Sequence, residues 1–378
     1  MSPTMRSIKA LPVFLADSLY LAKLQKVKKV FLLLSVIVLT ACSETETGYR
    51  PIPVSVDLST VPYQKLSDYH FFTGDMNDLE PSIGLIPFKP TSELFSDYAR
   101  KQRFIWLPVG TTATYTNDND ILQLPVGASL VKNFFYDNAQ PSGQRRIIET
   151  RLMIRKSSGW IFATYVWNDA QTEAFLDMNG STTSVTWTDN SGEHSINYGI
   201  PSENNCIACH AFADENLPIG IKPRNLNSDY PYEDGAMNQL SKLSAMGYLQ
   251  NLPSAITSIV NYNDTAQPLD LRVRSYFDIN CAHCHREGGS ADYTNPRFLF
   301  ELTTDPANMG VCVGAQLSPP GISHGQIVRP GNIGQSVLYY TMNTNDSNFR
   351  MPRLGRTVVH TEGVALIEEW INSLPGCE

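Results

Sequence analysis

Two pentads of the form C-x-x-C-H constrain this chain more than any other feature. They read Cys-Ile-Ala-Cys-His at 206–210 and Cys-Ala-His-Cys-His at 281–285. In such a pentad the two thiols lie about one helical turn apart, so both can bond vinyl groups of one porphyrin while the next imidazole faces its iron. The pattern predicts two covalently bound haems c. Their predicted attachment sites and proximal iron ligands are Cys206, Cys209, Cys281 and Cys284, with His210 and His285.

A C-x-x-C pair is also typical of zinc ribbons and of thioredoxin-like redox centres. The two pairs of a ribbon lie roughly 15–20 residues apart, whereas about seventy residues separate Cys209 from Cys281. A thioredoxin pair needs no following His, yet both pentads have one in a chain with only 7 His residues. Haem attachment is therefore the favoured interpretation.

Residues 1–42 are typical of a targeting segment. Lys26, Lys28 and Lys29 precede an apolar run at 30–40, which is shorter than the roughly 20 residues of a membrane span and suits the core of a signal peptide. The run ends in Leu-Thr-Ala-Cys, which resembles a bacterial lipobox with Cys42 as the lipidated residue. Ordinary secretory cleavage, leaving a plain thiol, is the alternative. Either predicts export to the periplasm or cell envelope, with a lipid anchor in a bacterial membrane in the first case.

Export also bears on the spare cysteines and on the charge. Cys312 and Cys377 are left over after haem attachment and lipidation, and in an oxidising compartment they are candidates for a disulfide, with two free thiols as the alternative.

Residues 1–42 hold six of the 29 basic residues and one of the 37 acidic residues, so the remaining chain has a net charge near −13. That charge disfavours nucleic acid and favours redox partner proteins with basic docking patches.

The rest of the chain is expected to be multidomain. After a tether at 43–60, a β-rich domain at 61–200, sandwich or barrel-like, is predicted from short alternating apolar runs separated by turn residues. A first haem-binding segment at 201–260 contains one expected helix at 236–246. Residues 268–378 are expected to form a mostly α-helical cytochrome c-like second haem domain, with helices at 270–280 and from 361 to Pro375.

The distal iron ligands are less well defined by the sequence. Met351 is the candidate for the second haem, because Pro352 restricts its loop and His/Met ligation is typical of cytochromes c. His360 and Met342 are alternatives. For the first haem the sequence leaves several possibilities open, including an open coordination site; the side chains considered are Met237, Met246, His70 and His194. His283 is interpreted as an incidental spacer, His324 as loop surface, and Glu149 and Asp169 as ordinary surface or strand-end carboxylates.

With these residues in hand, the chain resembles a family of exported diheme c-type cytochromes from marine and related bacteria. The resemblance runs from about 61 to 375. It is carried by the strings at 93–101, 149–152, 165–168, 238–240, 277–285, 350–355 and 362–371. It implies an N-terminal β-rich region joined to two haem sites and supplies no substrate.

The function expected from the sequence is electron transfer between periplasmic or membrane redox partners. A diheme oxidoreductase is the alternative, acting on peroxide or a sulfur compound at a five-coordinate first haem. A third class is a redox-tuned module whose β domain binds a carbohydrate or a protein. Residues 61–200 contain no acidic pair or nucleophile–base motif that would support hydrolysis.

Overall fold

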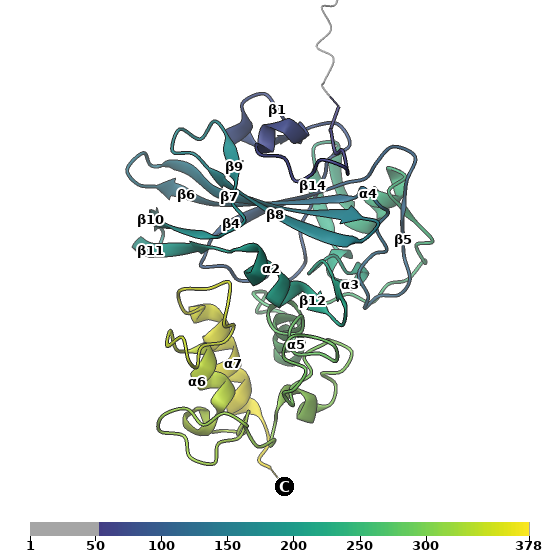
Figure 1. Ribbon diagram of the computed structural model, residues 1–378. Helices are drawn as coiled ribbons and strands as arrows, with labels where there is room; N and C mark the ends of the chain where they lie inside the picture. Colours follow the sequence, from purple (N-terminus) through teal and green to yellow (C-terminus); the bar gives the residue numbers. More distant parts are fainter. Residues whose placement is uncertain (1–52, 378) are drawn as a thin grey trace, which may run out of the picture. The chain divides into compact units, whose positions relative to one another are not determined.

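An eight-stranded sheet is the largest element of the structure, a computed structural model that describes residues 53–377 (Figure 1). The predicted signal segment and Cys42 lie outside the described residues. Neighbouring strands follow the order β11-β10-β6-β7-β8-β9, and β3 and β4 extend the sheet from β6. All of these pairs are antiparallel. The strands of this sheet are β3 (Ile86–Phe88), β4 (Arg100–Trp106), β6 (Ser129–Ala139), β7 (Gln144–Lys156), β8 (Gly159–Trp167), β9 (Ala174–Leu176), β10 (Ser181–Asp189) and β11 (Gly192–Ile200).

The two faces of this sheet differ in what covers them. Alternation along the strands sends one set of side chains into an apolar core with the N-terminal segment, where Tyr69 and Tyr165 are fully buried and share a hydrogen bond of 2.9 Å. Trp167 is buried in the same core. The opposite face carries Arg103 of β4, Lys132 of β6 and Arg151 of β7, which all line one cavity with residues of the C-terminal part.

Short elements follow the sheet between 201 and 260. Three helices, α2 (Glu203–His210), α3 (Pro223–Leu226) and α4 (Gln239–Ala245), alternate with two-stranded pairs. The helix expected at 236–246 is α4, whose N-cap Asn238 accepts backbone hydrogen bonds from residues 240 and 241. The short strands here and earlier in the chain are β1 (Phe72–Thr73), β2 (Glu80–Pro81), β5 (Ala113–Thr114), β12 (Ala211–Phe212), β13 (Glu215–Asn216), β14 (Asp229–Tyr232), β15 (Gly235–Asn238) and β16 (Leu249–Gln250).

Three helices form the apolar centre of the C-terminal part: α5 (Leu269–Asn280), α6 (Val337–Met342) and α7 (Thr361–Ser373). α5 and α7 pack against each other through Phe277 and Ile367, both with no exposed surface. Burial of side chains of this size stabilises the fold by about 1.5–3 kcal/mol each. Cys312 and Cys377 form a disulfide that joins the chain's last residues to the loop before α6.

The expectation of a mostly α-helical cytochrome c-like module is wrong. The described chain has 28% strand and 20% helix, with six helices, and only α5, α6 and α7 lie beyond residue 268. The long loop between α5 and α6 explains much of the difference, because glycine and proline recur along it and interrupt helical hydrogen bonding. They stand at 288, 289, 296, 306, 310, 314, 319, 320, 321, 325, 330, 331 and 334.

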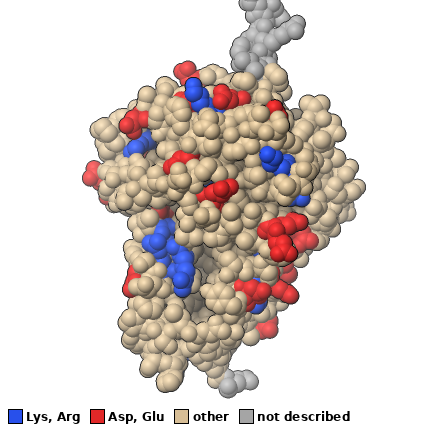
Figure 2. Space-filling view, viewed as in Figure 1, with Lys and Arg blue, Asp and Glu red and all other residues tan. Residues whose placement is uncertain are grey.

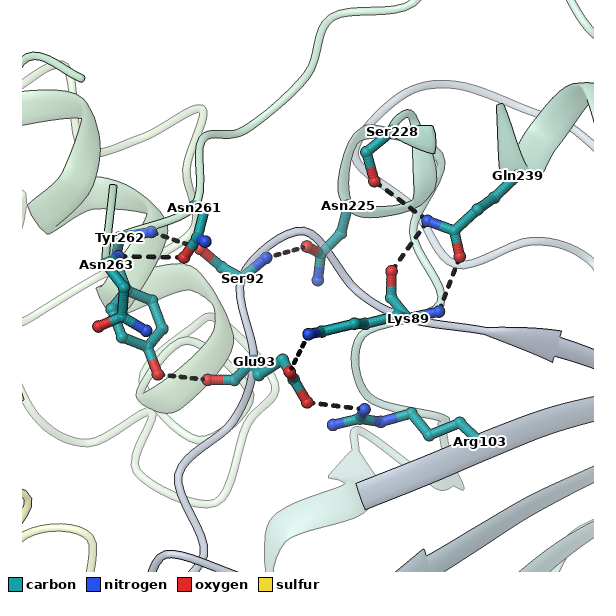
Figure 3. A network of polar contacts seen from close by, with 10 residues as sticks. All are labelled: Lys89, Ser92, Glu93, Arg103, Asn225, Ser228, Gln239, Asn261, Tyr262 and Asn263. Atoms are coloured by element: carbon teal, nitrogen blue, oxygen red, sulfur yellow. Dashed lines mark hydrogen bonds and ion pairs between the residues drawn. The ribbon is translucent and has the colours of Figure 1, made fainter. Parts of the chain in front are cut away.

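A polar segment after β3 joins the sheet to the later elements (Figure 3). The backbone N–H of Lys89 donates to the side-chain oxygen of Gln239 on α4. The backbone N–H of Ser92 donates to the side-chain oxygen of Asn225. The Ser92 hydroxyl donates to the carbonyl of residue 260 and accepts from the backbone N–H of Tyr262. The Glu93 carboxylate pairs with Arg103 of β4 at 2.9 Å. These contacts hold the sheet edge against α3, α4 and the chain that precedes α5. Within residues 53–377 no helix has the length and apolar character needed to cross a membrane.

Candidate functional site

The first pentad lies on α2, which begins directly after β11. Ser202 caps this helix by accepting from the backbone N–H of Asn205 and receives a reciprocal contact from the Asn205 side chain. On a helix, positions i, i+3 and i+4 share one face, so Cys206, Cys209 and His210 point the same way. That face lies against β8, where the rings of His210 and Phe162 have centroids 5.0 Å apart.

The second pentad begins where α5 ends. Cys281 is the C-cap residue, and its carbonyl accepts from the backbone N–H groups of Cys284 and His285 at 3.2 and 3.0 Å. The chain therefore continues through one further turn, which brings the second thiol and the imidazole back over the first thiol. The spacing of the pentad produces the same grouping here without a regular helix.

The two pentad histidines, His210 and His285, are held in the same tautomer. The Nδ1 of His210 lies 2.7 Å from the carbonyl oxygen of Leu217, which can only accept, so Nδ1 donates. The Nδ1 of His285 lies 2.9 Å from the hydroxyl of Thr294, and that hydroxyl donates its proton to the carbonyl of Ala291. In both rings Nε2 is therefore free of its proton and available to a metal, the arrangement that outer hydrogen bonds impose on histidine ligands.

Burial favours the neutral form of both rings. It lowers the pKa of His210 to about 3 and the pKa of His285 to about 4. A neutral imidazole is the form that ligates a metal.

One cavity of about 480 Å³ receives both pentads. All four pentad cysteines and both proximal histidines line it, together with apolar side chains from β8, α5, α6 and α7. Figure 2 shows a hollow between the sheet and the C-terminal helices, with Lys and Arg side chains gathered along one side of it. A largely apolar cavity with a few convergent polar groups is typical of a cofactor site.

The two pentads face each other across this cavity. The Sγ atoms of Cys209 and Cys284 and a ring nitrogen of His283 all lie within 4.8 Å of one another. A hydrogen bond between the two thiols lowers the pKa of Cys284 and raises that of Cys209. His283 is therefore part of the site and not an incidental spacer, and the three atoms are also a possible donor set for a soft metal ion.

The loop between α6 and α7 places Met351, while Met342 is the last residue of α6. Met351 and Met342 line the cavity, and the backbone N–H of Met351 donates to the carbonyl of Thr341 at 2.8 Å. The buried Arg356 side chain donates to backbone carbonyls on both sides of this loop, including Met351 at 3.1 Å and Thr344 at 2.8 Å. Asp97 accepts from the backbone N–H groups of residues 357 and 358. These contacts fix the loop that carries Met351 at the cavity.

His360, the other alternative ligand, also lines the cavity. Its ring stacks on Phe95 with centroids 4.1 Å apart, and its Nδ1 shares a hydrogen bond of 3.1 Å with the Tyr276 hydroxyl. Burial lowers the pKa of His360 to about 4.

The side chains considered for the first distal position lie away from the cavity. Met237 is on β15 and not on a helix, and Met246 follows α4; both are exposed. His70 follows a short 3₁₀ turn, and His194 on β11 pairs with Asp189. Met153 of β7 does line the cavity, beside Phe162 in the strand register. Its apolar strand gave no sign of this position.

Glu149 is not an ordinary surface carboxylate, because it has no exposed surface. It accepts from Arg151 Nε at 2.9 Å and from the Tyr198 hydroxyl at 2.7 Å. Asp169 lies in the turn after β8, and His324 lies in an exposed loop, as interpreted from the sequence.

Comparisons with protein-family models, with curated proteins and with solved structures found no match to this chain. What the site can do therefore follows from its own donors and shape. The donor chemistry fits haem attachment, because each pentad brings two thiols and an imidazole with a free Nε2 to a cavity lined largely by apolar side chains.

Proposed function

We propose that this protein is an exported diheme c-type cytochrome that transfers electrons between redox partners of the bacterial cell envelope. One observation carries the proposal: both C-x-x-C-H pentads line the same cavity, and the histidine of each pentad has an unprotonated Nε2 that can bind a metal. Bound haem supplies one-electron redox chemistry at its iron. In this proposal the chain resembles the exported diheme family in function as well as in its sequence strings.

The residues of the chain would divide the work as follows. Cys206 and Cys209 would hold one haem, and Cys281 and Cys284 the other, with His210 and His285 as proximal ligands. The hydrogen bonds to Leu217 and Thr294 would orient the imidazoles. Met351, on a loop fixed by Arg356, is the proposed distal ligand of the second haem, where a thioether would raise the reduction potential.

Two further properties belong to the same proposal. The acidic net charge of the chain favours partner proteins with basic docking patches and disfavours nucleic acid. Cys42 is the proposed lipid attachment site, which would keep the protein at a membrane after export.

Mass spectrometry of the natively matured protein tests the central claim. We expect the mass of the polypeptide plus two covalent haems. An unmodified polypeptide, or a zinc ion bound at Cys209, His283 and Cys284, would refute the proposal.

A diheme oxidoreductase is the second candidate, and one observation favours it. Of the ligands considered for the first haem, none of Met237, Met246, His70 and His194 lines the cavity. An open position at the first iron would admit a small molecule such as peroxide or a sulfur compound. An electronic spectrum distinguishes the two functions: two low-spin haems support the electron carrier, whereas one high-spin haem that binds cyanide supports the enzyme.

A further inference from the structure

A row of basic side chains crosses the sheet at the first pentad. The register of the antiparallel strands pairs Arg103 of β4 with Lys132 of β6, and Lys132 with Arg151 of β7. Directly paired residues share one face of a sheet. All three side chains line the cavity, so the row forms part of its wall.

The first pentad lies against this row. Thr164 of β8 pairs with Arg151 in the register. The Cys206 thiol contacts the Thr164 side chain and lies close enough to Arg151 for that positive charge to favour its thiolate form. α2 also contacts β8 directly. A group attached at Cys206 and Cys209 would therefore lie beside the row.

The charges of the row are not fully balanced within the described chain. Arg103 pairs with Glu93, and Arg151 pairs with Glu149. No ion pair to Lys132 exists among residues 53–377, where its ammonium lies 4.8 Å from the ring centroid of Phe134. Arg353 and Arg356 add two more positive charges to the cavity wall, while no Asp or Glu of the described residues lines it.

This excess is unusual for the chain, because acidic residues outnumber basic ones by 37 to 29. Lys132 is half-buried in the cavity wall, and an ammonium partly withdrawn from water without a counter-charge is costly unless an anion pairs with it. Burial, and then repulsion by Arg103, Lys101 and Arg151, lower the pKa of Lys132 well below its usual value. A carboxylate placed among these cations would form charge-assisted hydrogen bonds with them.

We propose that Lys132, together with Arg103 and Arg151, binds the propionate carboxylates of the haem attached at Cys206 and Cys209. The inference rests on the proposed function. Its chemistry is that of a carboxylate or oxyanion, which could also be supplied by a small anion from solution. The covalently attached group is favoured, because the attachment thiols lie beside the row.

The test compares Lys132→Gln with Lys132→Arg and with Lys65→Gln, in which an exposed lysine outside the cavity is replaced. Each protein is matured natively. The measurements are the haem content by mass, the midpoint potential of each haem, and the propionate vibrations in resonance Raman spectra. Lys132→Met serves as a second neutral variant if Lys132→Gln does not accumulate.

Loss of the cation should disfavour the reduced form of the first haem. We expect both neutral variants to retain two haems, to shift the propionate vibrations, and to lower the reduction equilibrium constant of one haem about tenfold, which is 59 mV for one electron. Lys132→Arg should restore most of the shift, and Lys65→Gln should match the native protein.

Three outcomes would count against the inference or its basis. If haem is present but the neutral variants behave like Lys65→Gln, Lys132 does not bind propionate. If added sulfate or acetate shifts the native potential saturably and only Lys132 variants lose that response, the row binds a solution anion instead. If the native protein contains no haem, the proposed function itself fails.

Discussion

The two pentads have the same sequence pattern but different surroundings. The first lies on a capped helix against the charged face of a sheet, beside Lys132 and Arg151. The second follows α5 and is enclosed by α6, α7 and the loop of Met351, in an apolar cluster. Identical attachment chemistry is thus combined with different neighbours: the row of Arg103, Lys132 and Arg151 lies beside the first pentad, whereas the helices and the Met351 loop, with Arg353 and Arg356, surround the second. Since surroundings tune a haem's potential, the difference predicts two haems that are reduced at different potentials.

Removing the cysteines of one pentad at a time should have the largest effect, because each variant keeps only one of the two attachment sites. We expect Cys206→Ala/Cys209→Ala and Cys281→Ala/Cys284→Ala each to retain one covalent haem, and their redox titrations to show the two potentials separately. Intact-protein mass and potentiometry make the measurement. A matched control is Cys312→Ala/Cys377→Ala, which removes the disulfide and should keep both haems. Loss of both haems from either pentad variant would mean that the two sites cannot form independently.

The charged face of the first region should contribute strongly to stability. Glu149→Gln removes the buried carboxylate that balances the Arg151 guanidinium. The substitution therefore leaves that guanidinium inside the structure without a counter-charge. Breaking a buried pair in this way costs about 3–5 kcal/mol. Chemical denaturation should show that loss. Glu193→Gln, at an exposed position of β11 in the same sheet, should change the unfolding free energy by less than about 0.5 kcal/mol. Equal effects of the two substitutions would contradict the assigned role of Glu149.

Much of the sheet could be predicted, because alternation of apolar residues is local information. β4, β6, β7, β8 and β10 all lie within 61–200, where that alternation predicts a β-rich domain. The cavity could not be predicted, since its two pentads lie about seventy residues apart and meet only in the tertiary structure. Glu149 was interpreted as an ordinary surface or strand-end carboxylate, and Lys132 and Arg151 were not singled out, because alternation distinguishes the two faces of a sheet but not what covers each face. The register of three basic residues in adjacent strands was the signal that could have found the row.

The prediction of a mostly helical C-terminal part was wrong for a different reason. Apolar spacing correctly indicated helices near α5 and α7, but it did not reveal how little helix lies between them. Packing around the second pentad relies on loops held by hydrogen bonds such as those of Arg356 and Asp97. Such contacts depend on residues that are distant in sequence, so a periodic pattern does not report them.

His360 gives the second region a pH dependence of its own. Burial lowers its pKa to about 4, and repulsion by Lys101 and Arg356 adds to the shift while Glu362 opposes it. Between about pH 6.5 and pH 4 the ring therefore stays neutral in the folded protein, whereas it takes up a proton in the unfolded chain. Its contribution to stability is complete above pH 6.5 and is lost as pH falls from 6.5 through 4. The full loss is about 3 kcal/mol.

Unfolding free energies of the native protein and of His360→Gln, measured between pH 7 and 4, test this dependence. We expect the difference between them to shrink as the pH falls, because glutamine does not titrate. The groups facing the ring are Tyr98, Tyr262, Tyr276, Phe95, Lys101, Arg356 and Glu362. His324→Gln, at an exposed loop position, is the matched control and should leave the pH profile unchanged. Parallel profiles for the native protein and His360→Gln would show that His360 is not the titrating group.

Met351→Ala sharpens the comparison of the two regions with the smallest expected change. If the thioether ligates the second iron, its loss should lower the potential of that haem by on the order of 100 mV, within the ~0.8 V range that axial ligands control. The methionine–iron absorption should disappear, while the first haem stays unchanged because its region has a different wall. Met246→Ala, exposed and outside the cavity, should have no effect on either haem. Retention of the methionine signal in Met351→Ala would transfer the ligand role to Met342 or Met153, and only the second of these would place the thioether beside the first pentad. The same variant therefore decides which of the two pentads holds the haem of higher potential.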